Sequence, residues 1–322
     1  MRDKWIGFYE KRFVYFIISG AIMLAGIIAI FINGVQLDIQ FKGGAIVKYN
    51  SATEINISQA EDVAAGVLGR QVNAQISKDL LSEQNRLVLN LAGNTGLDAA
   101  DQDKLDTALK AAFPDANLSL SDSSMVEPFF GRRFLSNGLL AIGLASVMIV
   151  LYVWMRFRRI HGLSAGVMAL VALLHDLLVV FFTCVIFKIP LGDSFVAIAL
   201  TIIGYSINDT IVIYDRIREN ARLDRHMPAD VLVNKSITQS LGRSINTNLA
   251  VFISVLMIYI FAVGGSIDSI QSFALPMTVG TVSGCYSTIC IAGPLWAMWQ
   301  KRTKRPHKPA PKAQTKLKKK TA

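Results

Sequence analysis

The sequence predicts an α-helical membrane protein that crosses the bilayer six times and carries one small α+β domain outside the cytoplasm. Two compositional observations lead to this fold class. Hydrophobic residues make up 52% of the 322 residues and charged residues only 17%, whereas soluble domains hold about 25% charged residues. Residues 34–133, in contrast, have the polar composition of a soluble domain. We therefore expect lipid to surround most of the chain and water to surround this one segment.

Six apolar stretches are long enough to cross a hydrocarbon core of roughly 30 Å, which takes about 20 helical residues. The first follows basic residues, as in a signal peptide, but it is longer than a usual signal core and no cleavage site follows. We therefore expect an uncleaved anchor helix. The last stretch is long and is interrupted by Gly280, Gly284 and Gly293. The expected spans are 13–33, 134–154, 163–187, 193–214, 246–264 and 270–299.

Lysine and arginine are concentrated in every second connection between the spans. They gather in the N-terminus, in residues 155–162, in a predicted 215–245 loop and in the tail 301–322. By the positive-inside rule these segments are cytoplasmic, so both termini are inside and the 34–133 segment is outside. The expected division of the chain is 1–33 for the N-terminus and first helix, 34–133 for the outer domain, 134–300 for helices two to six, and 301–322 for the tail.

The basic tail accounts for the net charge of the whole protein. It contains ten Lys or Arg residues and no acidic residue, which equals the formal net charge of +10 for the chain. The rest of the chain is close to neutral, so the charge does not indicate a nucleic-acid-binding domain and we expect no nucleic-acid partner. We expect the tail to be disordered and to lie against anionic lipid.

The outer domain alternates between strand and helix patterns. Apolar and polar residues alternate over four short runs, as in half-buried strands, while two longer runs have apolar residues at helical spacing. The order is β-α-β-β-α-β, which is the ferredoxin-like or split-βαβ arrangement. The strands are expected at 45–50, 73–79, 86–92 and 116–122, and the helices at 58–69 and 97–113.

No pattern in the chain is typical of an enzyme or of a metal site. Cys184, Cys285 and Cys290 all lie in apolar runs without CxxC or Cys/His spacing, so we interpret them as small apolar side chains within helices. The pair Gly43-Gly44 is too short for a phosphate-binding loop. Since no nucleophile-base set is present either, we expect no enzymatic activity and no cofactor.

Two of the predicted spans contain ionisable residues far from their ends. His175 and Asp176 lie about halfway along the third span, and Asp209 lies well inside the fourth. A carboxylate at mid-membrane costs on the order of 3 kcal/mol on insertion scales, so it is kept only beside a partner or a water-filled cavity. Ser206 and Thr210 share a helical face with Asp209. For Asp176 we favour a structural role over a functional one, because His175 is expected to point to a different face.

Arg243, at the start of the fifth span, is the natural cationic partner for Asp209. Polar residues follow it, including Thr247. One interpretation is a permanent buried salt bridge that fixes the register of two helices. The other is a proton relay, in which Asp209 binds and releases a proton as the guanidinium moves. The residues alone leave both interpretations open.

The stretch GYSINDTIVIYDRIREN at 204–220 is the most specific motif in the chain. Other motifs are FKGGAIVKY (41–49), VEPFFG (126–131), LYVWMRFR (151–158), ALLHDLL (172–178), LGRSINTNL (241–249), GG (264–265) and GTVSGCYSTI (280–289). Together, and in this order, they resemble the SecF family of protein-export membrane proteins, which is the SecD/SecF family of the RND superfamily. The resemblance covers almost the whole chain outside the basic tail.

The resemblance implies a six-helix half of a twelve-helix RND-type assembly in the bacterial inner membrane, with SecD as the other half. The assembly would lie beside the SecYEG channel and use the proton-motive force to draw a translocating preprotein outward. YajC and YidC are further candidate partners. The resemblance also places Asp209 and Arg243 on a proton pathway. Further candidates for this pathway are Asp176, Asn208, Ser206 and Thr247.

The chain departs from the family pattern after Arg243. Where the family often has a Thr-Ser pair and further threonines, this chain has Thr247-Asn248, followed by Ala250 and Val251. Asn248 preserves a polar group, but hydroxyls are lost. The fifth span therefore offers fewer hydroxyls to line a water path.

Two other functions are compatible with these residues. One is half of a small-molecule RND-type exporter, although a single small outer domain leaves little room for a substrate tunnel. The other is a structural scaffold of the translocon without ion transport. The sequence also leaves open whether the coupling ion is H⁺ or Na⁺, because one Asp and one Arg suit a proton relay without excluding sodium.

Overall fold

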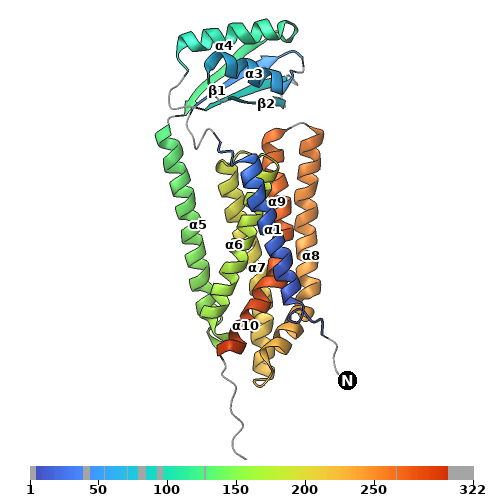
Figure 1. The fold of residues 1–322 in the computed structure, drawn as a ribbon. Coiled ribbons are helices and arrows are strands. Elements are labelled where there is room, and N and C mark those ends of the chain that lie inside the picture. Colours follow the sequence, from blue (N-terminus) through green and yellow to red (C-terminus); the bar gives the residue numbers. More distant parts are fainter. Residues whose placement is uncertain are drawn as a thin grey trace, which may run out of the picture.

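The computed structural model describes residues 5–38, 44–53, 55–70, 72–78, 85–92, 97–126, 128–265 and 267–303. This part of the chain forms a long bundle of helices with a small α+β domain at one end of the bundle (Figure 1). The two parts correspond to the two compositions in the sequence, because the bundle is apolar and the small domain is polar. The predicted fold class is therefore confirmed.

A four-stranded sheet forms the centre of the α+β domain. Helices α3 (Ile57–Leu68) and α4 (Ala99–Ala112) lie together on one face of this sheet (Figure 1). All neighbouring strands are antiparallel, in the order β2-β3-β1-β4. This order confirms the predicted ferredoxin-like arrangement. The strands are β1 (Gly44–Ser51), β2 (Val72–Lys78), β3 (Asn85–Ala92) and β4 (Ser119–Val126).

The core of this domain lies between the sheet and the two helices. In the register of β1 against β3, Val47 is opposite Leu89 and Tyr49 is opposite Leu87. Alternate residues of a strand point to the same face, so these four side chains share the face that the helices cover. The fully buried members of this core include Val47, Tyr49, Leu89, Ala60, Ala64, Leu105 and Leu109.

The fourth strand begins later than the sequence predicts. Residues 116–122 were expected to form it, but Pro114–Ala116 form a 3₁₀ turn, η1, and Asn117 has a left-handed backbone with φ 44°. Ala116 and Leu118 are buried in the domain core. Their apolar character therefore reflects the packing of the turn and not the start of the strand.

Six helical stretches in the described residues are long and apolar enough to cross a membrane, as predicted. The sixth consists of α9, a π-helical turn η3, and α10, which follow one another without a break. A short 3₁₀ turn, η2 (Arg158–Ile160), joins the second and third. The helices are α1 (Arg12–Asn33), α5 (Pro128–Arg156), α6 (Gly162–Ile186), α7 (Asp193–Leu223), α8 (Ala229–Gly264), α9 (Asp268–Ser287), η3 (Thr288–Ala292) and α10 (Gly293–Thr303).

The predicted 215–245 loop is wrong, because most of it is helical. Helix α7 continues to Leu223 and α8 already begins at Ala229, so only five residues connect them. The two extensions pack against each other through buried Ile217 and Val233, and Asn220 Nδ2 donates to Ser236 Oγ at 2.9 Å. The high charge of this segment marks exposed faces of two packed helices and not an irregular loop.

The six stretches are buried to very different degrees. In their most apolar windows, α6 is 61% buried, α7 50% and the α9–α10 stretch 67%, whereas α1, α5 and α8 are each 11% buried. The glycines of the sixth stretch explain part of this packing. A Cβ on Gly280 would lie 2.7 Å from Ile202 Cδ1, and one on Gly284 would lie 3.3 Å from Ser206 Cβ. These glycines let α9 approach α7 closely.

The two ends of the bundle differ in character. Helix α1 begins, and α10 ends, at the end of the bundle that is remote from the α+β domain (Figure 1). The short connection between α7 and α8 and the turn η2 also lie at this remote end (Figure 1). The arginines of 155–162 and of the α7–α8 region therefore gather at one end of the bundle.

Candidate functional site

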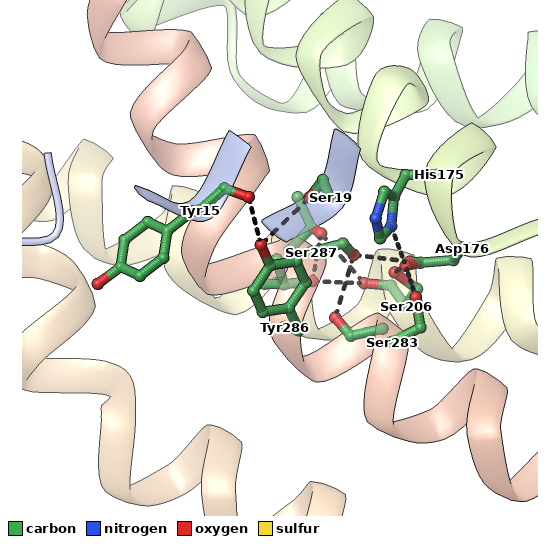
Figure 2. A network of polar contacts seen from close by, with 11 residues as sticks. Tyr15, Ser19, His175, Asp176, Ser206, Ser283, Tyr286 and Ser287 are labelled. Atoms are coloured by element: carbon green, nitrogen blue, oxygen red, sulfur yellow. Dashed lines mark hydrogen bonds and ion pairs between the residues drawn. The ribbon is translucent and has the colours of Figure 1, made fainter. Parts of the chain in front are cut away.

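Asp176 is the centre of a polar network inside the helical bundle (Figure 2). Its side chain is fully buried and accepts hydrogen bonds from two neighbouring helices. Ser206 Oγ of α7 donates to Oδ2 at 2.7 Å. From α9, Ser283 Oγ donates to Oδ1 at 2.6 Å, and Ser287 Oγ donates to Oδ2 at 2.7 Å. One carboxyl group therefore connects α6 to α7 and to α9.

His175 adds a fourth polar contact to this carboxyl group. The sequence places His175 on a different face of the helix, but its Nδ1 lies 3.3 Å from Asp176 Oδ1 in the structure. An N–H on Nδ1 would donate to the carboxylate at this distance. Three hydroxyls and one imidazole therefore surround the two oxygens of this buried carboxyl group.

On the side away from Asp176, the His175 ring contacts Tyr286, which in turn contacts α1. His175 Nε2 is buried without a hydrogen-bond partner, and the ring centroid lies 5.9 Å from that of Tyr286. Tyr286 Oη donates to the backbone oxygen of Tyr15 at 2.7 Å and lies 3.1 Å from Ser19 Oγ. Figure 2 shows the contacts of Tyr286 with α1 beside the Asp176 network, and the ring contact between His175 and Tyr286 lies between the two.

The π-helical turn η3 begins immediately after Ser287. Its first residue, Thr288, is buried, and Thr288 Oγ1 lies 3.0 Å from Thr210 Oγ1 of α7. Thr210 Oγ1 also donates to the backbone oxygen of Ser206 at 3.1 Å. Single π-helical turns within α-helices are frequent at functional sites. The π-helical turn that interrupts the α-helical hydrogen bonds of the sixth stretch therefore lies beside the Asp176 network.

Asp209 lies on α7 close to this network but faces another helix. Asn248 Nδ2 of α8 donates to Asp209 Oδ2 at 2.8 Å, and Tyr205 Oη donates to Asn248 Oδ1 at 2.8 Å. Asp209 and Asn248 are both buried. The partner of Asp209 is thus the amide at the position where the chain departs from the SecF pattern.

Arg243 does not pair with Asp209 in this structure. No ion pair joins the two within the described residues, and Arg243 is exposed. It lines a hollow of about 560 Å³ at the remote end of α7 and α8, together with Asp215 and Gln239. The permanent salt bridge that the sequence allowed is therefore not formed here.

The structure brings together only some of the predicted pathway residues. Asp176 and Ser206 are in direct contact, and Asp209 lies one helical turn from Ser206. Asn208, Arg243 and Thr247 are exposed on the outer faces of α7 and α8. They make no contact with either carboxyl group among the hydrogen bonds and ion pairs of the described residues.

Several members of the site were not predicted as pathway residues. They are Ser283, Ser287, Thr288, Tyr205, His175 and Asn248. The signal for two of them was the pattern GTVSGCYS, in which Ser283 and Ser287 are four residues apart and therefore lie on one helical face. Among the described residues, no group of three or more His, Cys, Asp or Glu side chains converges, so this part of the chain offers no such ligand set for a metal ion.

Comparisons with known proteins agree on one family. Residues 104–302 match the family described as "Protein export membrane protein SecD/SecF, C-terminal". The protein translocase subunit SecF of Alicyclobacillus acidocaldarius is 34% identical over 292 residues, which cover 90% of this chain and 91% of that protein. The protein translocase subunit SecF of Petrotoga mobilis is 31% identical over 307 residues, which cover 94% of this chain and 99% of that protein.

Longer relatives and solved structures contain the same region. The protein translocase subunit SecDF of Bacillus subtilis is 34% identical over 305 residues, which cover 93% of this chain but 39% of that protein. The crystal structure of SecDF from Thermus thermophilus, described as a translocon-associated membrane protein, superposes with a TM-score of 0.74 at 27% sequence identity. That match covers 93% of this chain and 39% of the SecDF chain. The chain thus spans about two fifths of these SecDF proteins.

Proposed function

The chain belongs to the SecF family of protein-export membrane proteins, and on that premise we propose that it is a proton-driven subunit of the Sec export machinery. In this role it pairs with SecD beside the SecYEG channel and promotes the movement of preproteins across the inner membrane. The role in export is inferred from membership of this family. The coupling to protons rests on the geometry of the two buried carboxyl groups.

The observation that carries the proposal is that Asp176 and Asp209 are buried among neutral hydrogen-bond donors. Asp209 is bonded to an amide, and Asp176 is bonded to three hydroxyls and contacts one imidazole. An ionised carboxylate within a membrane span is costly unless partners stabilise it, and binding a proton removes that cost. A fixed guanidinium would instead keep Asp209 permanently charged. The arrangement therefore supports reversible proton binding over a structural salt bridge.

The proposed pathway runs along α7. Arg243 lines the hollow at the remote end of the bundle, where protons would exchange with water. Asp209 is the proton-binding group farther along α7. Ser206 lies one helical turn from it on the same helix and donates to Asp176. Movement of Arg243 toward Asp209 would favour the carboxylate and release its proton. This switch would be coupled to rearrangement of the helices.

The exposed polar residues of α7 and α8 support SecD as the partner. Asn208 and Thr247 belong to helices that are long and apolar enough to cross a membrane, and both are exposed. Polar side chains that face lipid are unfavourable, whereas they form hydrogen bonds when another helix covers them. The SecDF relatives carry the matching region within a longer chain, which provides a candidate for such a covering partner.

The proposal also includes the predicted topology. Both termini are cytoplasmic, and the 34–133 domain is outside, where it would contact the emerging preprotein. The arginines at the remote end of the bundle support this orientation by the positive-inside rule. The divisions at 33, 133 and 300 and the contacts with YajC and YidC remain predictions of the same proposal.

The experiment that tests proton coupling compares Asp209→Asn with wild type in inverted membrane vesicles. Secretion of a reporter protein and proton flux are measured in the same preparation, after assembly has been verified. We expect both activities to fall at least tenfold, because an amide keeps the size and the hydrogen bond of the carboxyl group but binds no proton. Arg243→Met is expected to reduce both activities in the same way.

A matched control is Asp224→Asn, which changes the same residue type just after the end of α7 and is exposed. It should leave both activities unchanged. Wild-type secretion and flux in Asp209→Asn and Arg243→Met would refute proton coupling and favour the scaffold. Increased drug accumulation without a secretion defect on deletion would favour the exporter. Replacing Na⁺ by K⁺ in the buffers should leave the wild-type activities unchanged if H⁺ is the coupling ion.

A further inference from the structure

A basic hollow lies at the end of the bundle that is remote from the α+β domain. Its volume is about 480 Å³, and it is formed by η2, the end of α7, the start of α8 and the side of α10. Arg159, Arg222 and Arg225 line it, and each of them is exposed. None of these three arginines forms an ion pair among the described residues, whereas Arg218 in the same hollow pairs with Asp215 at 2.7 Å.

The hollow has a strong excess of positive charge. Asp224 is the single acidic side chain among its lining residues, and its Oδ1 accepts a hydrogen bond from the backbone N–H of His226 at 2.9 Å. Four arginines and one acidic side chain therefore surround a space large enough for a phosphate group, so positive charge is in clear excess. Arginine binds phosphate oxygens through two parallel N–H donors. This charge distribution indicates an anionic ligand with phosphate chemistry.

The floor of the hollow is apolar. Ile160, Leu232 and Trp296 line it and are almost completely buried. A fully hydrated soluble anion gains nothing from such a surface. An amphipathic ligand, in contrast, places its charged part near the arginines and its apolar part against these side chains.

An apolar groove continues from the hollow along the outside of the bundle. Its volume is about 400 Å³, and it shares His161 and Gln300 with the basic hollow. Trp154, Leu163 and Trp299 line it with exposed fractions of 42%, 59% and 50%. Tryptophan is enriched where helices leave the hydrocarbon core and enter the headgroup region. The groove is therefore at a depth that suits the start of an acyl chain.

Helix α6 begins at the boundary between the two spaces. Its first residue, Gly162, lines the groove, and no side chain caps the first turn. The backbone N–H groups of an uncapped first turn are free to donate to an anion. These neutral donors lie in the groove that adjoins the basic hollow.

We propose that this composite site binds one anionic phospholipid, with its phosphate group between Arg159, Arg222 and Arg225 and an acyl chain in the groove between Trp154 and Trp299. Basic pockets between membrane helices on the cytoplasmic side are suited to such headgroups. The arginines of this site lie outside the basic tail 301–322, and an apolar groove adjoins them. A bound lipid would fix the short α7–α8 connection against η2 and α10.

The test uses the full chain, with any co-purifying partners, in nanodiscs that contain equal amounts of phosphatidylglycerol and phosphatidylcholine. Native mass spectrometry after mild delipidation measures how much of each lipid stays bound. We expect wild-type protein to retain one phosphatidylglycerol. The triple variant Arg159→Gln, Arg222→Gln and Arg225→Gln should lose affinity about fivefold for each removed charge, or on the order of 100-fold in total.

The matched control is Lys318→Gln, Lys319→Gln and Lys320→Gln in the basic tail, which removes the same charge at the same side of the membrane. It should retain the lipid. Equal loss in both triple variants would show a diffuse charge effect and overturn the site. If the arginine triple variant does not fold, Arg225→Glu on the exposed α7–α8 connection provides a second test, with loss of lipid expected and full retention contradicting the proposal.

A further measurement distinguishes the source of the phosphate group. Inorganic pyrophosphate is added to the protein in detergent without phosphatidylglycerol, and thermal unfolding is recorded. We expect no stabilisation at millimolar concentrations, because pyrophosphate lacks the acyl chain. Stabilisation that disappears in the arginine triple variant would identify a soluble phosphate site and overturn the lipid assignment. Equal retention of phosphatidylcholine and phosphatidylglycerol by wild-type protein would also overturn it.

Discussion

At the scale of single residues, Asp176 shows how one buried carboxyl group can hold a membrane bundle together. Three serine hydroxyls from α7 and α9 donate to it at 2.6 to 2.7 Å. Removing a hydrogen-bond partner from a buried polar group costs about 1 to 3 kcal/mol. Removal of one donor leaves this buried carboxyl group with one hydrogen bond fewer. We therefore assign Asp176 a structural contribution in addition to its place in the proposed pathway.

This contribution predicts the effect of removing the donors one at a time. Ser206→Ala and Ser283→Ala should each lower the stability of the bundle by about 1 to 3 kcal/mol. Thermal unfolding in detergent is followed with a thiol-reactive dye, which gains access to buried Cys184 when the helices separate. Ser254→Ala is the control, because Ser254 is exposed on α8 and, among the described residues, its hydroxyl donates to the Ala250 backbone oxygen. Equal melting of the four proteins would contradict the assigned role of the network.

The residues of this network were only partly predictable. Asp176 and Asp209 could be identified from the sequence, because a carboxylate within an apolar span is costly unless it has a partner. Ser283 and Ser287 could not, since serine in a helix commonly donates to the backbone one turn earlier and carries no cost. The expected pairing of Asp209 with Arg243 failed for a further reason. A long arginine side chain can extend from its helix to the aqueous end, and the hollow beside Arg243 gives it that space.

At the scale of elements, glycine determines how closely the helices approach. Gly26 of α1 is buried against the ring of Phe182 on α6, and a Cβ at this position would overlap the ring. The same helix is also tied to α6 by Asn33 Nδ2, which donates to the Val185 backbone oxygen at 3.2 Å. Since α1 has little buried surface, these contacts and those of Tyr286 with Tyr15 and Ser19 hold it in position.

Gly26→Ala should therefore displace α1 and destabilise the bundle by about 1 to 3 kcal/mol through overpacking. Gly20→Ala on the same helix is the control, because a Cβ there has no neighbour within 4 Å. We expect it to be neutral or slightly stabilising, since alanine favours a helix by up to about 1 kcal/mol over glycine. The dye-based unfolding measurement applies to both variants. If Gly26→Ala melts at or above the temperature of Gly20→Ala, the contact with Phe182 does not limit the packing.

The existence of the elements was predictable, but their ends and contacts were not. Apolar length gave the six spans, and period-two alternation gave the strands of the sheet. The segment 215–245 was predicted as a loop because it connects two apolar spans, whereas buried Ile217 and Val233 show that both helices continue into it and pack there. Gly280 and Gly284 were interpreted as interruptions of a helix. They are points of close approach, which can be recognised only when the opposing helix is known.

At the scale of the whole molecule, the six helices have an asymmetric distribution of buried surface. Helices α6, α7 and α9 form the interior, while α8 is mostly exposed along an apolar face that includes Leu249, Ile253 and Met257. Lipid can cover such a face. Contact with lipid is unfavourable for the exposed side chains of Asn208 on α7 and Thr247 on α8, because lipid tails offer them no hydrogen-bond partners. The exposed polar side of α7 and α8 is therefore where we expect the second half of the assembly to bind.

This arrangement predicts which positions are covered in the assembled complex. A photo-activatable side chain introduced at Asn208 should form a covalent link to SecD in membranes, because α7 would lie in the interface between the two halves. The same side chain at Leu144 of α5 should link to lipid, since Leu144 is 58% exposed and apolar. Cross-linked products are identified by immunoblotting against SecD and by mass spectrometry. Cross-links to SecD from position 144 and none from position 208 would place the partner on the α5 side of the bundle. The exposed polar residues of α7 and α8 would then face lipid. SecD would not cover the side of the bundle that contains the proposed proton pathway, which would contradict the proposed interface.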